Sequence, residues 1–419
     1  MTSNEIKNLD AQYVMQTYGR YDAVIERGEG ATLYGPEGKE YIDFTAGIGV
    51  NSIGYGNKKW ADAIYAQALK LQHISNLYYS EPYAKLAKVL TERAGMKNVF
   101  FSNAGGEANE GMIKLARKYS FDKYGKGRST IISLVQSFHG RTITTLAATG
   151  QEVFHNYFFP FTEGFKFVPA NDINALESAV CPNSEFGIRN SELNIDQETG
   201  STRDGVCAVI IELIQGEGGV LPLDESYVKA VAELCTANDL LLLIDEVQTG
   251  VGRTGTLFTY QQYGITPDVV SFAKGIAGGL PMGGIMANEK CSAVFTPGTH
   301  ATTFGANPVV AAGALETLRQ LDDKALLEVT KKGAYIRDIV LSWNLPVVLD
   351  VRGRGLMVGL SLDGAVPKEV ASKCVETGLL ILTAGSDALR MLPPLTISYE
   401  EIDKGLGILK GVLEDFCNE

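Results

Sequence analysis

Five short apolar segments alternate with longer helical or polar segments through the central part of this 419-residue chain. Each apolar segment is followed by a Gly-rich or polar turn. These candidate strands are Val99–Phe101, Thr130–Leu134, Ala208–Ile211, Leu240–Ile244 and Val269–Phe272. Strands separated by helical segments are typical of a mostly parallel sheet that helices cover on both faces. The alternation therefore predicts an α/β fold.

The segment that follows Phe101 has the clearest helical pattern. Its apolar residues return at spacings that place them on one helical stripe: Ala108, Met112, Leu115, Ala116 and Tyr119. Glu107 and Glu110 lie in the first turns, where the helix dipole favours negative charge. We expect a helix that begins directly after the first candidate strand.

The ends of the chain lie outside this alternation. A chain of 419 residues exceeds one simple core. We therefore expect a large domain over residues 53–308, and a smaller α+β domain built from residues 1–52 and 309–419. Residues 181–205 are polar and without periodicity, which indicates a surface insertion.

Composition excludes several classes of protein. The net charge of −12 argues against nucleic acid and anionic membranes as partners. No apolar run is long enough to span a membrane, and the polar first residues lack the apolar core of a signal peptide. The six cysteines form no CxxC pair, so we expect neither a disulfide framework nor a metal site. These features favour a cytoplasmic protein.

In an open α/β sheet, ligands bind at the carboxyl ends of the strands. Asp245 follows one candidate strand there, although a helix cap or a loop carboxylate is an equally good interpretation. Lys274 follows another, inside a glycine-rich apolar run. A solvated lysine is the commoner interpretation of such a residue. A desolvated lysine, however, has a lowered pKa and is a nucleophilic amine able to form a Schiff base.

The other strand ends carry further candidates. Gly105 and Gly106 precede the predicted helix, where free backbone N–H groups could bind a phosphate, although an ordinary tight turn fits as well. Phe138 could stack on a flat ring and Arg141 could pair with a carboxylate, against the alternatives of a core Phe and a surface Arg. Glu212 and Glu217, after Ala208–Ile211, add two acids to the same rim.

These candidates gain meaning from their joint occurrence at the ends of successive strands. An anion cradle, an aromatic ring, an acid and an amine are the parts needed to hold a phosphorylated pyridine aldehyde. No GK[ST] sequence follows the two glycines, so a P-loop nucleotide site is not expected.

The motifs resemble those of the class III (fold type I) aminotransferases over essentially the whole chain. LLLIDEVQTGVGRTG (241–255) and PDVVSFAKGIAGGLPMGG (267–284) are long and specific for this class. FFSNAGGEANEGMIKLAR, SFHGRT, IQGEGG and HATTFGANP follow the family order. HISNLYYSEP (73–82) and the N-terminal region favour the acetylornithine branch.

The resemblance implies a pyridoxal 5′-phosphate (PLP) cofactor bound as a Schiff base to Lys274. It implies that Asp245 pairs with the pyridine nitrogen. It also assigns the remaining cofactor contacts, namely the ring faces, the ring hydroxyl and the phosphate, to Phe138, Val247, Gln248, Gly105, Gly106 and Thr303. Because the family's equivalent of Thr303 comes from the neighbouring subunit, the resemblance implies a homodimer.

The resemblance also implies the substrates. Arg141 would bind a donor carboxylate, Arg390 the α-carboxylate of glutamate, and Glu217 would pair with Arg390 in between. Tyr18 would lie near the α-amino end of ornithine-like donors. The implied reaction moves the terminal amine of N-acetylornithine to 2-oxoglutarate, giving glutamate and N-acetylglutamate 5-semialdehyde, as in arginine biosynthesis. The alternatives are donation by ornithine, succinylornithine or 4-aminobutyrate, an epimerase or decarboxylase, and a non-catalytic PLP-binding protein.

The sequence departs from the family pattern in several places. Ala104 replaces a usual Ser or Thr, which removes one hydroxyl near the phosphate. Leu213 replaces a usual Pro, and Ala301 and Ala306 replace usual glycines around Thr303. None of these changes touches Lys274 or Asp245, so they bear on the substrate and not on the reaction class.

Overall fold

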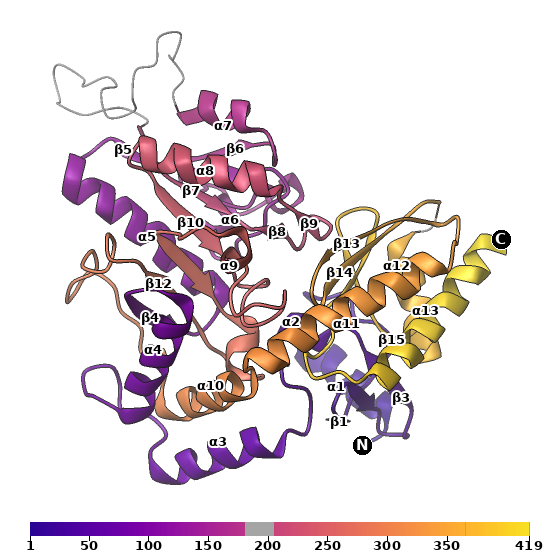
Figure 1. Cartoon of the computed structure of the whole chain (residues 1–419). Helices are drawn as coiled ribbons and strands as arrows, with labels where there is room; N and C mark the ends of the chain where they lie inside the picture. The colour runs from indigo at the N-terminus through magenta and orange to yellow at the C-terminus, as the bar shows by residue number, and fades with distance from the viewer. Residues whose placement is uncertain (181–204, 365, 419) are drawn as a thin grey trace.

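The computed structural model describes residues 1–180, 205–364 and 366–418. Its elements form a large part around a seven-stranded sheet and a smaller part that holds both chain termini (Figure 1). The expected insertion at 181–205 lies outside the described residues, apart from Gly205 at the start of a strand.

The large sheet has the strand order β4-β12-β11-β10-β7-β5-β6. Neighbouring strands are parallel, except that β12 runs antiparallel to β11 and β4. The strands are β4 (Asn98–Ser102), β5 (Arg128–Leu134), β6 (Phe165–Val168), β7 (Gly205–Ile211), β10 (Leu241–Asp245), β11 (Val269–Phe272) and β12 (Gly283–Ala287). All five predicted strands are present, and the mostly parallel sheet is confirmed.

Side chains alternate across the sheet and bury both of its faces. Leu241 and Leu243 of β10 join one apolar cluster, whereas Leu242 and Ile244 join another. Helix α5 (Gly105–Tyr124) supplies apolar residues to the first cluster, and α8 (Glu225–Ala237) supplies them to the second. Strands buried on both faces read as continuous apolar runs, which is why the sequence showed them.

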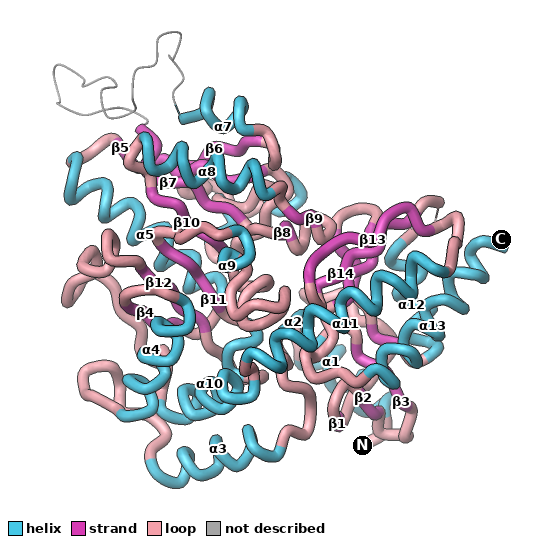
Figure 2. Tube along the Cα trace, viewed as in Figure 1, coloured by secondary structure: helices cyan, strands magenta, loops and turns pink. Residues whose placement is uncertain are grey.

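Figure 2 shows the helices in cyan, with α3 (Lys58–Lys70) and α10 (Pro308–Gln320) below the magenta strands of this sheet. None of the described helices is both long and apolar enough to cross a membrane. The bounds of the remaining helices of the large part, with two short 3₁₀ turns, are α2 (Ala46–Gly49), α4 (Glu81–Ala94), α6 (Ile143–Ala147), η1 (Glu152–Phe154), α7 (Ile173–Val180), α9 (Tyr260–Tyr263) and η4 (Lys274–Ala277).

The small part joins the two ends of the chain. Strand β15 (Leu379–Leu380) pairs in parallel with β3 (Glu40–Asp43), so an N-terminal and a C-terminal strand share one sheet. This confirms the expected α+β domain built from both ends, while the boundaries at 52 and 308 stay a prediction. Its other strands are β1 (Arg27–Glu29), β2 (Thr32–Tyr34), β13 (Val348–Arg354), β14 (Met357–Leu362), β16 (Leu382–Ala384) and β17 (Ala388–Met391). Strands β8 (Ile214–Gln215) and β9 (Leu221–Pro222) form a separate two-stranded ribbon.

Helices lie outside these strands on the right of Figure 1. Helix α13 packs against α11 and α12 and against β3 and β15. The bounds are α1 (Ser3–Tyr13), α11 (Asp323–Ser342), α12 (Pro367–Thr377) and α13 (Tyr399–Asn418).

Candidate active site

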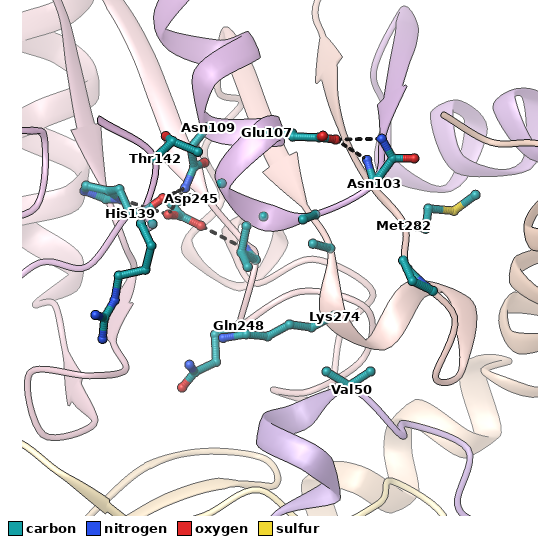
Figure 3. Close-up of a pocket in the computed structure, with 18 of the residues that line it drawn as sticks. Val50, Asn103, Glu107, Asn109, His139, Thr142, Asp245, Gln248, Lys274 and Met282 are labelled. Carbon is teal, nitrogen blue, oxygen red and sulfur yellow. Dashed lines mark hydrogen bonds and ion pairs between the residues drawn. The ribbon is translucent and has the colours of Figure 1, made fainter. Parts of the chain in front are cut away.

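A cavity of about 670 Å³ opens where the loops after β4, β5, β10 and β11 meet. Residues from all four loops line it, as expected for the carboxyl ends of parallel strands. Eight of the predicted site residues are among them: Gly105, Gly106, Phe138, Arg141, Asp245, Val247, Gln248 and Lys274. Figure 3 shows Lys274 and Gln248 at this pocket, below the group formed by Asp245, Asn109 and His139.

Asp245 is the last residue of β10 and only 4% exposed. Its Oδ2 accepts hydrogen bonds from Asn109 Nδ2 at 2.7 Å and faces His139 Nδ1 at 2.8 Å (Figure 3). Its Oδ1 accepts the backbone N–H of Val247 at 2.9 Å. A buried carboxylate needs such donors, and they fix the direction in which it points.

Asn109 and His139 were not among the predicted site residues, yet they hold Asp245 in place. Asn109 lies on α5 one turn after Gly105, and its Nδ2 also donates to the carbonyl of His139 at 2.7 Å. The Nε2 of His139 is buried without a partner among the described residues. In the sequence, Asn109 is a polar residue within the otherwise apolar stripe of this helix, and such a residue indicates a buried polar contact. The sequence alone could not tell what it would face.

Lys274 follows β11 by two residues and has a left-handed backbone, with φ of 46°. Strand pairing aligns Asp245 with Ser271, which brings the ends of β10 and β11 together. Burial lowers the pKa of Lys274 to about 8, although the carboxylates of Glu217 and Asp245 oppose this shift. The side chain is thus a partly neutral amine near neutral pH.

Gly105 and Gly106 begin α5, and Ala104 caps the helix without a side-chain hydrogen bond. The first amide after the cap that bonds back is that of Ala108, to the Ala104 carbonyl at 3.0 Å. The amides of the first turn therefore remain available to an anion. A Cβ atom on Gly105 would lie 2.7 Å from Val247 Cγ1, so only glycine fits there without a shift.

Phe138 lies on the cavity wall, and the carboxylate of Glu212 holds its backbone. Glu212 Oε2 accepts the Phe138 N–H at 2.9 Å, while Oε1 accepts the Gly216 N–H at 3.3 Å. Burial raises the pKa of Glu212 to about 7, against the opposing effect of His139. The sequence placed Glu212 on the rim of the site but gave it no role.

Arg390 and Glu217 lie close to the cavity and bind each other. Arg390 Nη1 donates to Glu217 Oε1 at 2.7 Å and to Gln248 Oε1 at 2.9 Å. Arg390 Nη2 donates to Glu217 Oε2 at 3.2 Å, which makes the ion pair bidentate. Burial raises the pKa of Glu217, but Arg390 opposes it strongly enough to leave the pKa below its usual value. The predicted pairing is present.

Arg141 differs from Arg390 in its surroundings. It lines the cavity and makes no hydrogen bond or ion pair within the described part of the chain. Thr303 and Tyr18 lie outside the cavity lining, and both are exposed, Tyr18 to 74%. The single subunit thus brings together the predicted residues apart from these two.

Comparison with known proteins places these features in a family. The family model described as "Aminotransferase class-III" matches residues 13–413. The chain is 49% identical to the acetylornithine aminotransferase of Haemophilus ducreyi, over 99% of this chain and 100% of that protein. It is 46% identical to the acetylornithine aminotransferase of Caldanaerobacter subterraneus subsp. tengcongensis, over 97% and 98%.

Solved structures give the same result. The ornithine aminotransferase of Toxoplasma gondii, with PLP at partial occupancy in its active site, superposes with a TM-score of 0.89 at 30% identity, covering 100% of this chain and 96% of that one. N-acetylornithine aminotransferase from Stenotrophomonas maltophilia has a TM-score of 0.81 at 34% identity, with 98% of each chain covered. Together with the fold and the cavity, these similarities establish that the chain belongs to the class III aminotransferases.

Proposed function

We propose that this aminotransferase transfers the terminal amine of N-acetylornithine to 2-oxoglutarate, giving N-acetylglutamate 5-semialdehyde and glutamate. The observation that carries the proposal is a pair of arginines in different states. Arg141 donates to no acceptor among the described residues, whereas Arg390 is paired with Glu217. Such a site can bind one carboxylate at Arg141 and admit a second at Arg390 only when Glu217 gives way. The similarity to acetylornithine aminotransferases supports this choice of donor.

Class III aminotransferases use PLP, and the residues present fit this cofactor. The free first-turn amides of α5 suit its phosphate, and the buried Asp245 suits its protonated ring nitrogen. Phe138 and Val247 line the cavity as apolar side chains for the two ring faces, with Gln248 as a polar neighbour for the ring hydroxyl. When bound, PLP supplies an electron sink that lets the carbon bearing the amine lose a proton.

Lys274 and Asp245 have separate roles in the proposed reaction. In its neutral form, Lys274 Nζ would be the base that takes the proton from the carbon bearing the amine, and it would deliver that proton to the cofactor carbon bonded to the same nitrogen. Its lowered pKa keeps enough of that form at neutral pH. Asp245, held by Asn109 and His139, would be the side chain that pairs with the ring nitrogen.

The arginines select the substrates. Arg141 binds the carboxylate of the donor and thereby places the amine at the far end of the molecule beside Lys274. Arg390 accepts the α-carboxylate of glutamate after its ion pair with Glu217 opens. Because ion pairing to Glu217 blocks Arg390 while the first donor binds, one site serves two substrates of different length.

We further propose a homodimer in which Thr303 reaches the phosphate of the neighbouring subunit and Tyr18 lies near the donor. Both residues are exposed in the single chain. Several large apolar side chains are exposed as well, as expected of a surface that a second subunit covers: Tyr13, Met15, Leu77, Tyr78, Tyr79 and Phe304. The proposed location is the cytoplasm.

A panel of amines with 2-oxoglutarate tests the choice of donor. We expect N-acetylornithine to give the highest kcat/KM, ahead of ornithine, succinylornithine and 4-aminobutyrate. A clear preference for 4-aminobutyrate would contradict the proposal. Omitting 2-oxoglutarate and analysing the products would reveal an epimerase or a decarboxylase.

Substitution of Lys274 tests the alternative that the chain binds PLP without catalysing a reaction. Under our proposal, Lys274→Ala abolishes turnover and the absorbance of the lysine-bound cofactor, while far-ultraviolet circular dichroism stays unchanged. Turnover that survives this substitution would contradict the role of Lys274.

A further inference from the structure

Phe154 lies directly beneath the guanidinium of Arg141. The Cζ atom of Arg141 is 4.3 Å from the centre of the Phe154 ring and 5.6 Å from that of Phe138. The two rings contact each other edge to face, with centres 5.7 Å apart and planes at 67°. Arg141 therefore rests on a pair of aromatic rings, of which Phe154 is the nearer.

Phe154 does not contribute to the apolar core formed by the described residues. It ends the 3₁₀ turn η1 and is half-buried. Phe138, by contrast, already faces the cavity as the ring proposed to stack on the cofactor. Phe138 is also a residue that the sequence places in the site, whereas Phe154 is not.

The contact with Phe154 restricts the side chain of Arg141 before a substrate binds. A long, flexible side chain loses rotational freedom when it binds a carboxylate, and this loss weakens binding. Arg390 is held by acceptors, which occupy N–H donors on its Nη1 and Nη2 atoms. An aromatic face attracts the guanidinium through its π electrons and leaves every N–H free. Arg141, which has no hydrogen-bond acceptor among the described residues, is held in this second way.

We propose that Phe154 is a positioning residue that holds Arg141 ready for a substrate carboxylate and so contributes to the choice of carboxylated donors. The inference rests on the proposed role of Arg141 in substrate binding. It assigns the effect to binding of the carboxylate and not to the chemistry at Lys274.

The test compares the holoenzyme with Phe154→Leu and Phe154→Tyr variants. The donors are N-acetylornithine and an alkyl amine of similar length without a carboxylate, each followed by the cofactor absorbance in the first half-reaction. Phe154→Leu should lower the apparent second-order rate constant for N-acetylornithine roughly 3- to 30-fold, mainly through weaker binding, because a cation–π contact of this kind has that strength. The alkyl amine should react unchanged. Phe154→Tyr, which keeps the aromatic ring, should bind N-acetylornithine as the wild type does.

Two controls separate positioning from general damage. Val153→Ala changes an exposed residue of the same turn and should have no effect. In an Arg141→Gln background, Phe154→Leu should cause no further loss, because the group it positions is gone. Equal losses with both donors, or a full effect of Phe154→Leu without Arg141, would overturn the inference.

The outcomes also distinguish this inference from the proposed function. If Arg141→Gln weakens binding of the donor carboxylate but Phe154→Leu does not, the inference fails and the proposed role of Arg141 stands. If Arg141→Gln itself leaves that binding intact, the assignment of Arg141 fails, and the inference fails with it.

Discussion

Lys274 is surrounded by charges of both signs, and burial is the largest influence on its pKa. A lysine in this sequence context is most often solvated, so its identity alone said little. Asp245 is similar, since its role depends on donors from α5 and from the loop after β5. At the scale of the residue, chemistry here comes from neighbours that are distant in sequence.

A first prediction concerns the amine of Lys274 in the cofactor-free protein. Because its pKa is lowered to about 8 from 10.5, the neutral, reactive form should appear as pH rises through 8. Labelling with an amine-directed reagent at a series of pH values, read by peptide mass spectrometry, measures this. Exposed Lys59 on α3 provides the internal reference. Labelling of Lys274 that rises in parallel with Lys59 would contradict the prediction.

A second prediction concerns Glu212, whose pKa burial raises to about 7, with an opposing effect from His139 and a further rise from Asp245. Since the folded-state pKa lies above the unfolded value of 4.5, its contribution to stability is full below 4.5 and is lost as pH rises through 7. Between pH 5 and pH 8, Glu212→Gln should therefore lose less stability than the wild type, by about 1–3 kcal/mol. Urea unfolding of the cofactor-free proteins tests this, and identical pH profiles would count against it.

At the scale of elements, the N-terminus of α5 shows what the sequence could and could not predict. The strand β4, the two glycines and the apolar stripe of α5 were all predicted. Strands β6 and β12 were not. β12 begins with two glycines, which are rare in strands, yet a Cβ on Gly284 would lie 2.5 Å from the Phe100 carbonyl. Close approach to β4 makes glycine necessary there, and only the pairing reveals it.

The close packing of Gly105 against Val247 leads to a third prediction. In Gly105→Ala, the added Cβ would meet Val247 Cγ1 at 2.7 Å, so the start of α5 must shift. Overpacking of this kind costs about 1–3 kcal/mol, and we expect weaker binding of the cofactor phosphate of similar size. Equilibrium titration of the cofactor-free protein with PLP measures it.

Val247→Ala provides the matched partner for that experiment. Combined with Gly105→Ala it removes the clash, so the double variant should bind the cofactor better than Gly105→Ala alone, and no better than Val247→Ala alone. An unchanged affinity in Gly105→Ala would show that this contact does not shape the cradle.

At the scale of the whole molecule, contacts between the large and small parts hold the site together. Arg390, on β17 of the small part, reaches Glu217 and Gln248 in the large part. Arg253, buried in the loop after β10, donates to the carbonyls of Leu356 and Pro393. These contacts explain part of the long motif at 241–255, in which Arg253 connects the two parts and does not line the cavity.

The proposed dimer yields a fourth prediction. Lys274→Ala and Thr303→Asp should each inactivate a homodimer, the first by removing the amine and the second by placing a negative charge against the phosphate. If Thr303 acts across the interface, a hybrid dimer has one intact site, and an equal mixture that is dissociated and reassembled should recover about a quarter of wild-type activity.

Each variant reassembled alone is the control for that mixture, with the proportion of dimers measured by analytical ultracentrifugation. Mixtures that stay as inactive as the separate variants, despite proven hybrids, would place Thr303 in the site of its own subunit.

The sequence alone determined the features that depend on near neighbours. These are the buried strands, the helix after β4, the glycine turn and, through long motifs, the reaction class. Periodicity and turn chemistry act over a few residues, so they can be read from the chain. The tertiary structure decided the partners of Asp245, the ion pair of Glu217 with Arg390, and the platform beneath Arg141. It also decided the lowered pKa of Lys274, because desolvation and charge act through space between segments that the sequence keeps far apart.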